Sequence, residues 1–321
     1  MSETSHPKEL LERISLGING PQISPLGTGT MQWGDRQIWE YGKGGYTDED
    51  IHQSFLASLE KGINFFDTAE VYGRGLSETF LGRFVNALED REQVVVATKF
   101  MPLPWRVRRS SLVKALRRSL NRLGLKRVDL YQIHWPFPPM PVEHWAAGLA
   151  DAVEDGLTRT VGVSNFNPSQ MNRAYETLSQ HGVLLTSNQV CYSLLDRGPE
   201  KSGLMHVCKE LGITLIAYSP LARGMLTGKY CPENPPGGVR RLMYAGALQR
   251  LSGLIAVLSQ MGEAHGGKTP AQVSLNWLIC KGAVPIPGAK TARQIEENVG
   301  ALGWRLSADE VAELDEISAS F

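Results

Sequence analysis

Short apolar segments recur along the chain, and most are followed by a stretch in which apolar residues return with a helical period. Segments such as VVVATK and ITLIAYS are largely continuous rather than alternating, as expected for strands buried on both faces in a parallel sheet. The pattern predicts eight strands, at residues 26–30, 63–67, 94–99, 129–134, 159–164, 186–190, 213–219 and 283–287.

Helical patterns fill the intervals, and small polar residues or prolines stand where several of them begin. The start signals are Thr47, Ser77, Ser110, Pro168 and Pro270, and the stop signals are Gly62 and Gly124. Strands and helices that alternate in this way imply right-handed crossovers and a parallel sheet.

Eight such units predict a closed (β/α)8 TIM barrel, an α/β fold, in place of an open sheet. Three segments lie outside the repeat: a β-hairpin at residues 14–23 with Asn19 and Gly20 at its turn, a loop rich in proline and glycine at residues 230–246, and a C-terminal helix after Ser307. No obvious linker divides the chain, so we expect residues 1–321 to form a single barrel domain.

Polar residues stand at the ends of almost all the predicted strands, where the active site of a TIM barrel lies. They are Asp67, Lys99, His134, Ser164, Asn165, Gln189, Tyr218 and Ser219. Taken singly, Asp67 could cap the next segment, Lys99 could lie at the surface, and His134 could be structural. A carboxylate, an ammonium and an imidazole on three successive strands are more than a barrel mouth requires, so the pattern favours a catalytic site.

Charge and composition exclude several classes of protein. The chain has 321 residues, with 33 Lys and Arg against 33 Asp and Glu, so its formal net charge is zero and a nucleic-acid binder is disfavoured. No apolar run reaches the about 18 residues of a membrane-spanning helix. Residues 1–12 lack the apolar core of a secretory signal. We therefore expect a cytoplasmic protein that contacts neither nucleic acid nor membrane.

Sequence motifs exclude other sites. The cysteines Cys191, Cys208, Cys231 and Cys280 have the spacing of neither a metal site nor a disulfide framework, so we interpret them as reduced thiols and expect no metal. No GxGxxG follows a strand and opens a helix, which disfavours a Rossmann domain. Any dinucleotide would have to bind in another way.

Three segments resemble the aldo-keto reductase superfamily, and the resemblance runs over nearly the whole chain. They are NFFDTAEVYGRGLSE at residues 64–78, SPLARGMLTGKY at residues 219–230, and IPGAKT at residues 286–291, which is followed by Gln294, Glu297 and Asn298. The form Tyr-Gly-x-Gly-x-Ser-Glu is closer to the bacterial, plant and potassium-channel β-subunit branches than to the animal aldose-reductase branch.

The resemblance implies a catalytic tetrad of Asp67, Tyr72, Lys99 and His134. Tyr72 would give a proton to the carbonyl oxygen, although an unperturbed phenol has a pKa of about 10. The Lys99 ammonium would lower that pKa, and Asp67 would keep Lys99 charged and oriented. His134 would hydrogen-bond the carbonyl oxygen and position it.

The resemblance also implies that NADPH is the cofactor and assigns its contacts. The nicotinamide carboxamide would meet Ser164, Asn165 and Gln189, its ring would stack on Tyr218, and the pyrophosphate would lie along Ser219, Leu221, Gly224, Lys229 and, from the long loop, Arg240. The 2′-phosphate would meet Gly288, Lys290, Thr291 and Gln294, and adenine would meet Glu297 and Asn298. Arg293 could add charge or be a solvated helix residue. Some branches have arginine in place of Gln294, so the preference for NADPH could rest on Lys290.

Aromatic residues after the strands predict a substrate pocket that suits aromatic or planar aldehydes. The pocket residues are Met31, Trp33, Trp105 and Trp135, with Phe137 beside them; the alternative is that some of them only pack loops. We interpret the basic run at residues 106–109, with Lys114, Arg117 and Arg118, as a solvated surface in preference to a phosphate-binding patch. Pyridoxal is one candidate substrate, because pyridoxal reductases of this superfamily share the Gly-Ala-Lys form of cofactor motif.

The leading hypothesis is therefore an NADPH-dependent reductase of aldehydes or ketones that acts on a small-molecule carbonyl substrate as a monomer or weak homo-oligomer. A second hypothesis is an NADPH-binding, redox-sensing regulatory subunit with little turnover. A lyase with Lys99 as a Schiff base would leave the motifs at residues 286–298 unexplained.

Overall fold

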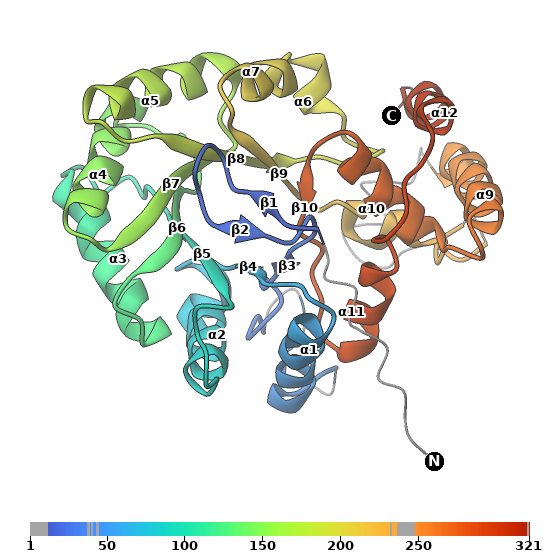
Figure 1. Ribbon diagram of the computed structural model, residues 1–321, viewed down its shortest axis with the longest axis horizontal. Coiled ribbons are helices and arrows are strands. Elements are labelled where there is room, and N and C mark those ends of the chain that lie inside the picture. Colours follow the sequence, from blue (N-terminus) through green and yellow to red (C-terminus); the bar gives the residue numbers. More distant parts are fainter. Residues whose placement is uncertain are drawn as a thin grey trace.

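Eight parallel strands, each paired with the next along the chain, form the centre of the protein (Figure 1). The computed structural model describes residues 12–36, 39, 41–42, 45–231, 233–235, 248–319 and 321. The strands are β3 (Thr28–Gly29), β4 (Phe65–Asp67), β5 (Val95–Phe100), β6 (Val128–Ile133), β7 (Thr158–Ser164), β8 (Leu185–Cys191), β9 (Thr214–Tyr218) and β10 (Val284–Pro285). Each of the eight predicted strands corresponds to one of them.

The first and last strands meet and close the barrel. The backbone N–H groups of Gly27 and Gly29 donate to the carbonyl oxygens of Pro285 and Pro287, both at 3.0 Å. A Cβ atom on Gly29 would lie 2.9 Å from the carbonyl oxygen of Ile286, so the seam needs a residue without a side chain at this close approach. The predicted TIM barrel is therefore confirmed.

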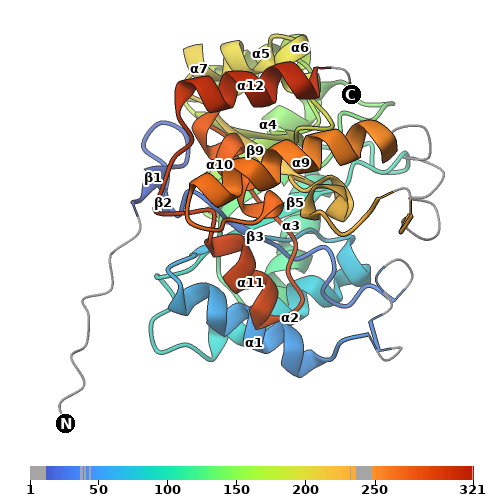
Figure 2. The same cartoon turned by 90° about the vertical axis from the view of Figure 1, so that its right-hand side faces the viewer.

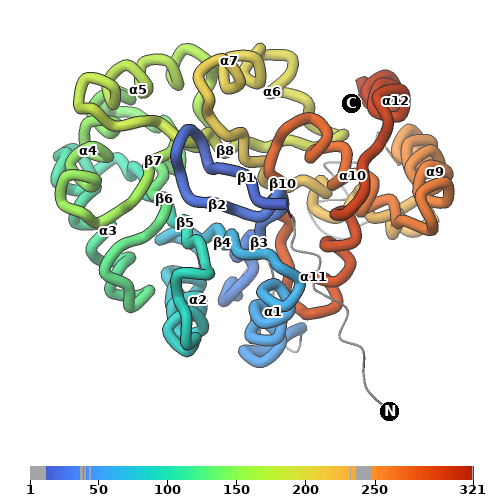
Figure 3. The backbone as a smooth tube through the Cα atoms, in the orientation of Figure 1, coloured from blue at the N-terminus to red at the C-terminus, as the bar shows by residue number. Residues whose placement is uncertain are grey.

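Helices surround the barrel, as the tube trace shows (Figure 3). They are α1 (Asp48–Glu60), α2 (Leu76–Asn86), α3 (Ser110–Leu123), α4 (Val142–Glu154), α5 (Pro168–Gln180), α6 (Gly198–Lys201), α7 (Leu204–Glu210), α9 (Leu248–Ala264), α10 (Pro270–Cys280), α11 (Ala292–Val299) and α12 (Ala308–Ser318). Thr47 caps α1 as predicted, and Pro168 and Pro270 stand in the first turns of α5 and α10. Most of the predicted loop at residues 230–246 lies outside the described residues, and α9 after it was not predicted.

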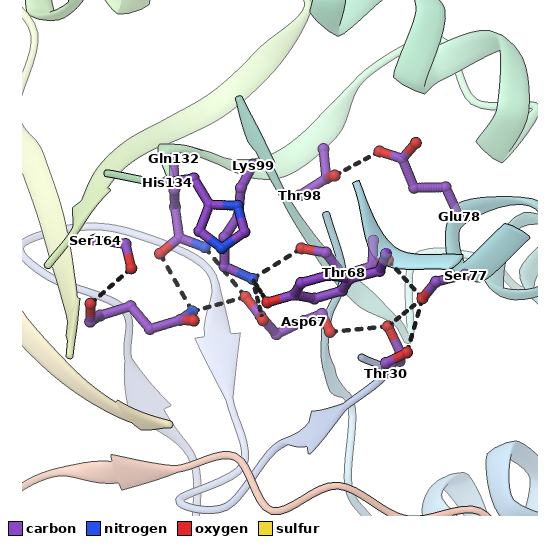
Figure 4. Close-up of polar contacts among 12 residues, drawn as sticks. Thr30, Asp67, Thr68, Ser77, Glu78, Thr98, Lys99, Gln132, His134 and Ser164 are labelled. Atoms are coloured by element: carbon purple, nitrogen blue, oxygen red, sulfur yellow. Dashed lines mark hydrogen bonds and ion pairs between the residues drawn. The ribbon is translucent and has the colours of Figure 1, made fainter. Parts of the chain in front are cut away.

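One predicted helix start is wrong. The start of α2 is Leu76, and its N-cap is Gly75 in a left-handed conformation with φ of 94°, so Ser77 is not the cap. The Ser77 hydroxyl is fully buried and lies 2.7 Å from the Thr30 hydroxyl and 2.8 Å from the Thr68 hydroxyl (Figure 4). This serine therefore connects the ends of β3 and β4 beside the barrel mouth. The N-cap of α2 is a glycine instead.

The predicted hairpin, β1 (Ile14–Ser15) paired with β2 (Gln22–Ile23), covers one end of the barrel (Figures 1 and 2). Leu16 and Ile23 belong to the same buried cluster as Phe65 and Ile216 from the barrel interior. The Gly17 N–H donates to the hydroxyl of Thr214, the first residue of β9, at 2.7 Å. The hairpin thus seals the N-terminal ends of the strands and leaves their C-terminal ends as the open mouth.

The predicted C-terminal helix, α12, is tied to the barrel through Asp315. This carboxylate accepts from Trp277 Nε1 at 3.0 Å and from Lys281 Nζ at 2.7 Å, and it lies 3.0 Å from Arg197 Nη2. These contacts connect α12 to α10 and to the segment before α6. Among the helices of the described residues, none has the length and apolar character that crossing a membrane requires.

Candidate active site

The polar residues that end successive strands meet at the open mouth (Figure 4). Asp67 ends β4, Ser164 ends β7 and Tyr218 ends β9, while Lys99 and Gln189 lie near the ends of β5 and β8. His134 follows β6, and its N–H donates to the carbonyl oxygen of Phe100 at 2.8 Å. Because the strands are parallel and in register, the barrel brings together residues that are far apart in the sequence.

Lys99 is the centre of the predicted tetrad. Its Nζ atom forms an ion pair with Asp67 Oδ2 and donates to the carbonyl oxygen of Thr68 at 2.9 Å and to the hydroxyl of Tyr72 at 3.3 Å. Both members of the ion pair are buried. Burial acts to lower the pKa of Lys99, but the Asp67 charge and the contacts with Tyr72 more than offset it, so that pKa is raised. The ammonium therefore stays charged.

Asp67 has partners on its other oxygen as well. Its Oδ1 accepts from Gln189 Nε2 at 2.8 Å and from Gln132 Nε2 at 3.1 Å. Figure 4 shows Asp67 close to Lys99 and to Gln132. Hydrogen bonds to both carboxylate oxygens compensate for the loss of water around a buried charge. Gln132 was not predicted; the signal in the sequence is a polar residue in β6, two positions before His134.

The chain turns sharply at Tyr72, which begins the 3-10 segment η1 (Tyr72–Gly75). Gly73, Arg74 and Gly75 all have positive φ, of 55°, 57° and 94°, which is strained for the arginine. The turn places the half-buried Tyr72 ring edge-on to His134, with centroids 5.7 Å apart and planes at 81°.

The ionisation of Tyr72 differs from the prediction. Burial raises the pKa of the Tyr72 phenol, and the nearby Lys99 charge acts to lower it. Lys99 therefore acts in the expected direction, but its effect is smaller than that of burial, so the phenol stays protonated at neutral pH. The sequence could not predict this balance because it depends on how deeply the barrel mouth encloses the hydroxyl.

His134 is almost fully buried, at 9% exposure. Burial, and then the charge of Lys99, lower the pKa of His134 to about 3. The imidazole is therefore neutral at pH 7, with one nitrogen as a donor and the other as an acceptor. Its Nδ1 atom is buried without a hydrogen-bond partner among the residues that the structure describes.

Amide and hydroxyl groups form a chain on the other side of the mouth. Tyr218 donates its hydroxyl to Asn165 Oδ1 at 2.9 Å, and Asn165 Nδ2 donates to the Ser164 hydroxyl and to the carbonyl oxygen of His134, both at 3.0 Å. Ser164 donates to the carbonyl oxygen of Gln189 at 2.8 Å. Asn165 has φ of 62°, in the left-handed region that asparagine adopts more readily than most residues. The residues predicted around the nicotinamide are therefore neighbours.

The segment after β9 carries the residues predicted to follow the pyrophosphate. Ser219, Leu221 and Gly224 lie on or just before η2 (Ala222–Thr227), and Ser219 and Gly224 have positive φ, of 51° and 90°. Lys229 is exposed, with its Nζ 5.5 Å from the centre of the Tyr230 ring. Arg240 lies outside the described residues.

Lys290 lies on the loop between β10 and α11, together with Gly288 and Thr291. Its backbone N–H donates to Gln294 Oε1 at 2.8 Å, and Thr291 caps α11. Its Nζ lies over two aromatic rings, 4.7 Å from the centre of Tyr46 and 5.8 Å from that of Trp39. Neither aromatic residue was predicted to belong to the site, although both stand in an aromatic-rich stretch after the first strand.

The adenine side of the predicted cofactor site is less enclosed. Glu297 is exposed and forms an ion pair with Arg293 at 3.1 Å, while Asn298 is buried. Arg293 is a candidate for a second positive group at the 2′-phosphate, but its contact with Glu297 favours the alternative of a solvated helix residue.

The residues predicted to line an aromatic pocket differ in their exposure. Met31 and Trp105 are exposed, at 45% and 75%, and Trp135 stacks on Phe137 with centroids 5.3 Å apart. The prediction is wrong for Trp33, which is fully buried and whose Nε1 donates to the carbonyl oxygen of Ala289 at 2.8 Å. Its ring packs inside the core, so it offers no surface to a substrate.

The basic run after β5 agrees in part with the prediction of a solvated surface: Arg108, Lys114, Arg117 and Arg118 are exposed, but Arg106 and Arg109 form ion pairs. Arg106 pairs with Glu70, and Arg109 forms a two-point ion pair with Asp151. Only 16% of the Arg106 side chain is exposed. These arginines therefore make internal contacts that the sequence did not reveal, because their partners come from other segments.

Comparisons with known proteins agree with this geometry. The Aldo/keto reductase family profile matches residues 25–319. The chain is 43% identical over 308 residues to the chloroplastic pyridoxal reductase of Arabidopsis thaliana, in an alignment that covers 92% of this chain and 84% of that protein.

Solved structures show the same likeness. A thermostable aldo-keto reductase, Tm1743, in complex with the inhibitor epalrestat superposes with a TM-score of 0.78 at 31% identity, covering 96% of this chain and 100% of that one. An aldo-keto reductase of Klebsiella pneumoniae in complex with NADPH superposes with a TM-score of 0.76 at 27% identity, covering 96% and 95%. The protein is therefore a member of the Aldo/keto reductase family of oxidoreductases.

Proposed function

We propose that the protein reduces an aldehyde or ketone to an alcohol with NADPH, and that Tyr72 gives the proton. The contact of 3.3 Å between Lys99 Nζ and the Tyr72 hydroxyl, beside the neutral His134, carries the proposal. Membership of the Aldo/keto reductase family and the NADPH complex of the Klebsiella structure support the cofactor.

The side chains along the mouth have the chemistry that NADPH requires. Ser164, Asn165 and Gln189 offer the amide and hydroxyl groups that suit a carboxamide. At the other end, Lys290, the Thr291 hydroxyl and the N-terminus of α11 offer positive charge and donors that suit a phosphate. Between them, Gly224 and Lys229 would lie along the pyrophosphate.

Bound NADPH would supply the hydride that reaches the carbonyl carbon. Tyr72 donates its hydroxyl proton to the carbonyl oxygen as negative charge develops there. The Lys99 ammonium stabilises the phenolate that remains, and Asp67 holds that ammonium in place. His134, being neutral, orients the carbonyl oxygen by a hydrogen bond and does not act as the acid.

Aromatic side chains on the segments that follow β5 and β6 favour an aromatic or planar carbonyl substrate. Trp105 and the stacked pair Trp135 and Phe137 offer flat apolar faces for such a ring. Pyridoxal is the first compound to test within this class, because the Arabidopsis relative is named a pyridoxal reductase.

A substrate panel tests the proposal. NADPH consumption is followed with pyridoxal, 4-nitrobenzaldehyde, methylglyoxal, sugar aldehydes and simple ketones, and NADPH affinity is measured separately by fluorescence. We expect measurable consumption with at least one aromatic aldehyde. If NADPH binds but no carbonyl compound oxidises it, the reductase proposal is wrong and the alternative of an NADPH-binding regulatory subunit is favoured.

A further inference from the structure

Glu70, two residues before Tyr72, is buried and holds three donors on one carboxylate. Arg106 donates from Nη1 to Oε1 and from Nη2 to Oε2, the latter at 3.1 Å. The backbone N–H of Met101 donates to Oε1 at 2.8 Å. Only 6% of the Glu70 side chain is exposed, so the pair is little screened by salt. A two-point contact of this kind fixes orientation as well as distance.

Arg106 is held from several sides. Its Nη1 also donates to the carbonyl oxygen of Met101 at 2.9 Å, and its guanidinium lies 5.1 Å from the centre of the Phe100 ring. These contacts use the planar fork and the face of the guanidinium, which a lysine does not have. The position therefore requires arginine and not only a positive charge.

The pair joins the two segments that carry the proton donor and its lysine. Glu70 lies in the turn that leads from β4 to Tyr72, whose N–H donates to the carbonyl oxygen of Ala69 at 3.1 Å. Arg106 lies in the segment of residues 101–109 that follows β5, the strand of Lys99. The contact thus sets the position of one loop against the other at the barrel mouth.

The same segment carries Trp105, which has little packing of its own. The Trp105 side chain is 75% exposed, and the neighbouring Val107 is 46% exposed. Within the segment, Arg106 N–H donates to the carbonyl oxygen of Leu103 at 2.8 Å and Leu103 N–H to that of Met101 at 2.9 Å. Because burial does not hold the indole, the anchored Arg106 beside it restricts where the indole can lie.

We propose that Glu70 and Arg106 are a positioning pair that holds Trp105 as a wall of the substrate pocket and thereby sets selectivity for aromatic carbonyl compounds. This inference rests on the proposed reductase function. Glu70 acts through Arg106 and Trp105, and it does not touch the reacting atoms.

The test is the effect of Glu70→Gln on selectivity. Glutamine keeps the shape and an acceptor for Met101 but loses the charge that binds the guanidinium. We expect the ratio of kcat/KM for 4-nitrobenzaldehyde over methylglyoxal to fall about tenfold, the factor that corresponds to losing one charge-assisted hydrogen bond. Arg106→Lys should give the same fall, mainly through KM. An equal loss for both aldehydes would overturn the proposal.

A double-mutant cycle shows whether Glu70 acts through the indole. Trp105→Ala should lower the same ratio, and adding Glu70→Gln to that variant should lower it no further. A full additional effect of Glu70→Gln without the indole would mean that the carboxylate acts by another route, and the proposal would be wrong.

Glu143→Gln is the matched control, because Glu143 forms a two-point pair with Arg173 on the outer face of α4 and α5. It should leave the ratio unchanged; a fall in this variant as well would contradict the assignment to the mouth.

Limited trypsin digestion measures how firmly the segment of residues 101–109 is held, and it does not depend on catalytic activity. Cleavage after the exposed Arg108, identified by mass spectrometry, should be faster in Glu70→Gln than in the wild type or Glu143→Gln. Unchanged cleavage would overturn the positioning role. If the wild type consumes NADPH with no carbonyl compound of the substrate panel, the reductase proposal and the role in selectivity are both wrong, and the digestion still decides whether the pair fixes the loop.

Discussion

Lys99 Nζ lies 3.3 Å from the hydroxyl of Tyr72, and the same ammonium is paired with Asp67. Burial holds the Tyr72 proton on the phenol, while Lys99 is placed to stabilise the anion once the proton has left. The arrangement favours proton transfer only when a carbonyl oxygen is gaining charge beside the hydroxyl. The first prediction follows from this contact.

Tyr72→Phe should remove the proton donor and leave the shape of the mouth intact. We expect kcat to fall by at least about 10²-fold, the usual contribution of a general acid, with NADPH affinity near that of the wild type. Steady-state kinetics and fluorescence titration measure the two quantities. Tyr131→Phe is the control, since Tyr131 is buried in β6 outside the mouth and should keep its activity. Loss of NADPH binding in Tyr72→Phe would mean that Tyr72 is structural.

Lys290 should determine the preference for NADPH over NADH. Lys290→Met removes the positive charge beside the N-terminus of α11, and we expect NADPH affinity to fall about tenfold or more, the scale of one lost charge-assisted hydrogen bond. NADH affinity should change much less, because NADH has no 2′-phosphate. The exposed Lys209→Met on α7 is the control for net charge. Equal losses for both cofactors would refute the role of Lys290.

The low pKa of His134 predicts a dependence of stability on pH. Its pKa is about 3 in the folded protein against 6.5 for an ordinary histidine, so between these values the unfolded chain binds the extra proton. The free energy of unfolding therefore rises with pH in this window, and His134 contributes a slope of up to about 1.4 kcal/mol per pH unit. The contribution of the neutral His134 to stability is complete above its pKa in the unfolded chain. It is lost as the pH falls toward its pKa in the folded protein.

Urea unfolding of His134→Gln at several pH values checks this slope. Between about pH 4 and pH 6, the variant should show a flatter pH dependence than the wild type. The exposed His181→Gln serves as the control and should keep the wild-type slope. Parallel curves for His134→Gln and the wild type would show that the imidazole takes up a proton in the folded state.

Asp315 should contribute to stability more than a surface carboxylate does. Asp315→Ala leaves Trp277 Nε1 without its acceptor and removes one of the two carboxylates that Arg197 and Lys281 share, the other being Glu200. We expect the free energy of unfolding to fall by about 2 kcal/mol. Glu143→Ala, which breaks an exposed pair, should cost less than about 1 kcal/mol. Urea denaturation measures both, and equal losses in the two variants would contradict the special role of Asp315.

Much of the barrel was predictable because its signals are local. The buried strands, the helix starts at Thr47 and Pro270 and the hairpin at residues 14–23 each show in a short stretch of sequence. The strand ends also identified residues that do meet at the mouth, since parallel strands bring their C-terminal ends together.

The sequence by itself thus determined the order of strands and helices and the residue types at the mouth. Only the tertiary structure decided that Trp33 belongs to the core and not to a substrate pocket. It also decided that Gln132 hydrogen-bonds Asp67 and that Glu70 binds Arg106. Only the fold, finally, makes burial outweigh Lys99 in setting the pKa of Tyr72. The reason is physical: periodicity and capping act within a few residues, whereas solvent exclusion and ion pairing depend on groups that only the folded barrel brings together.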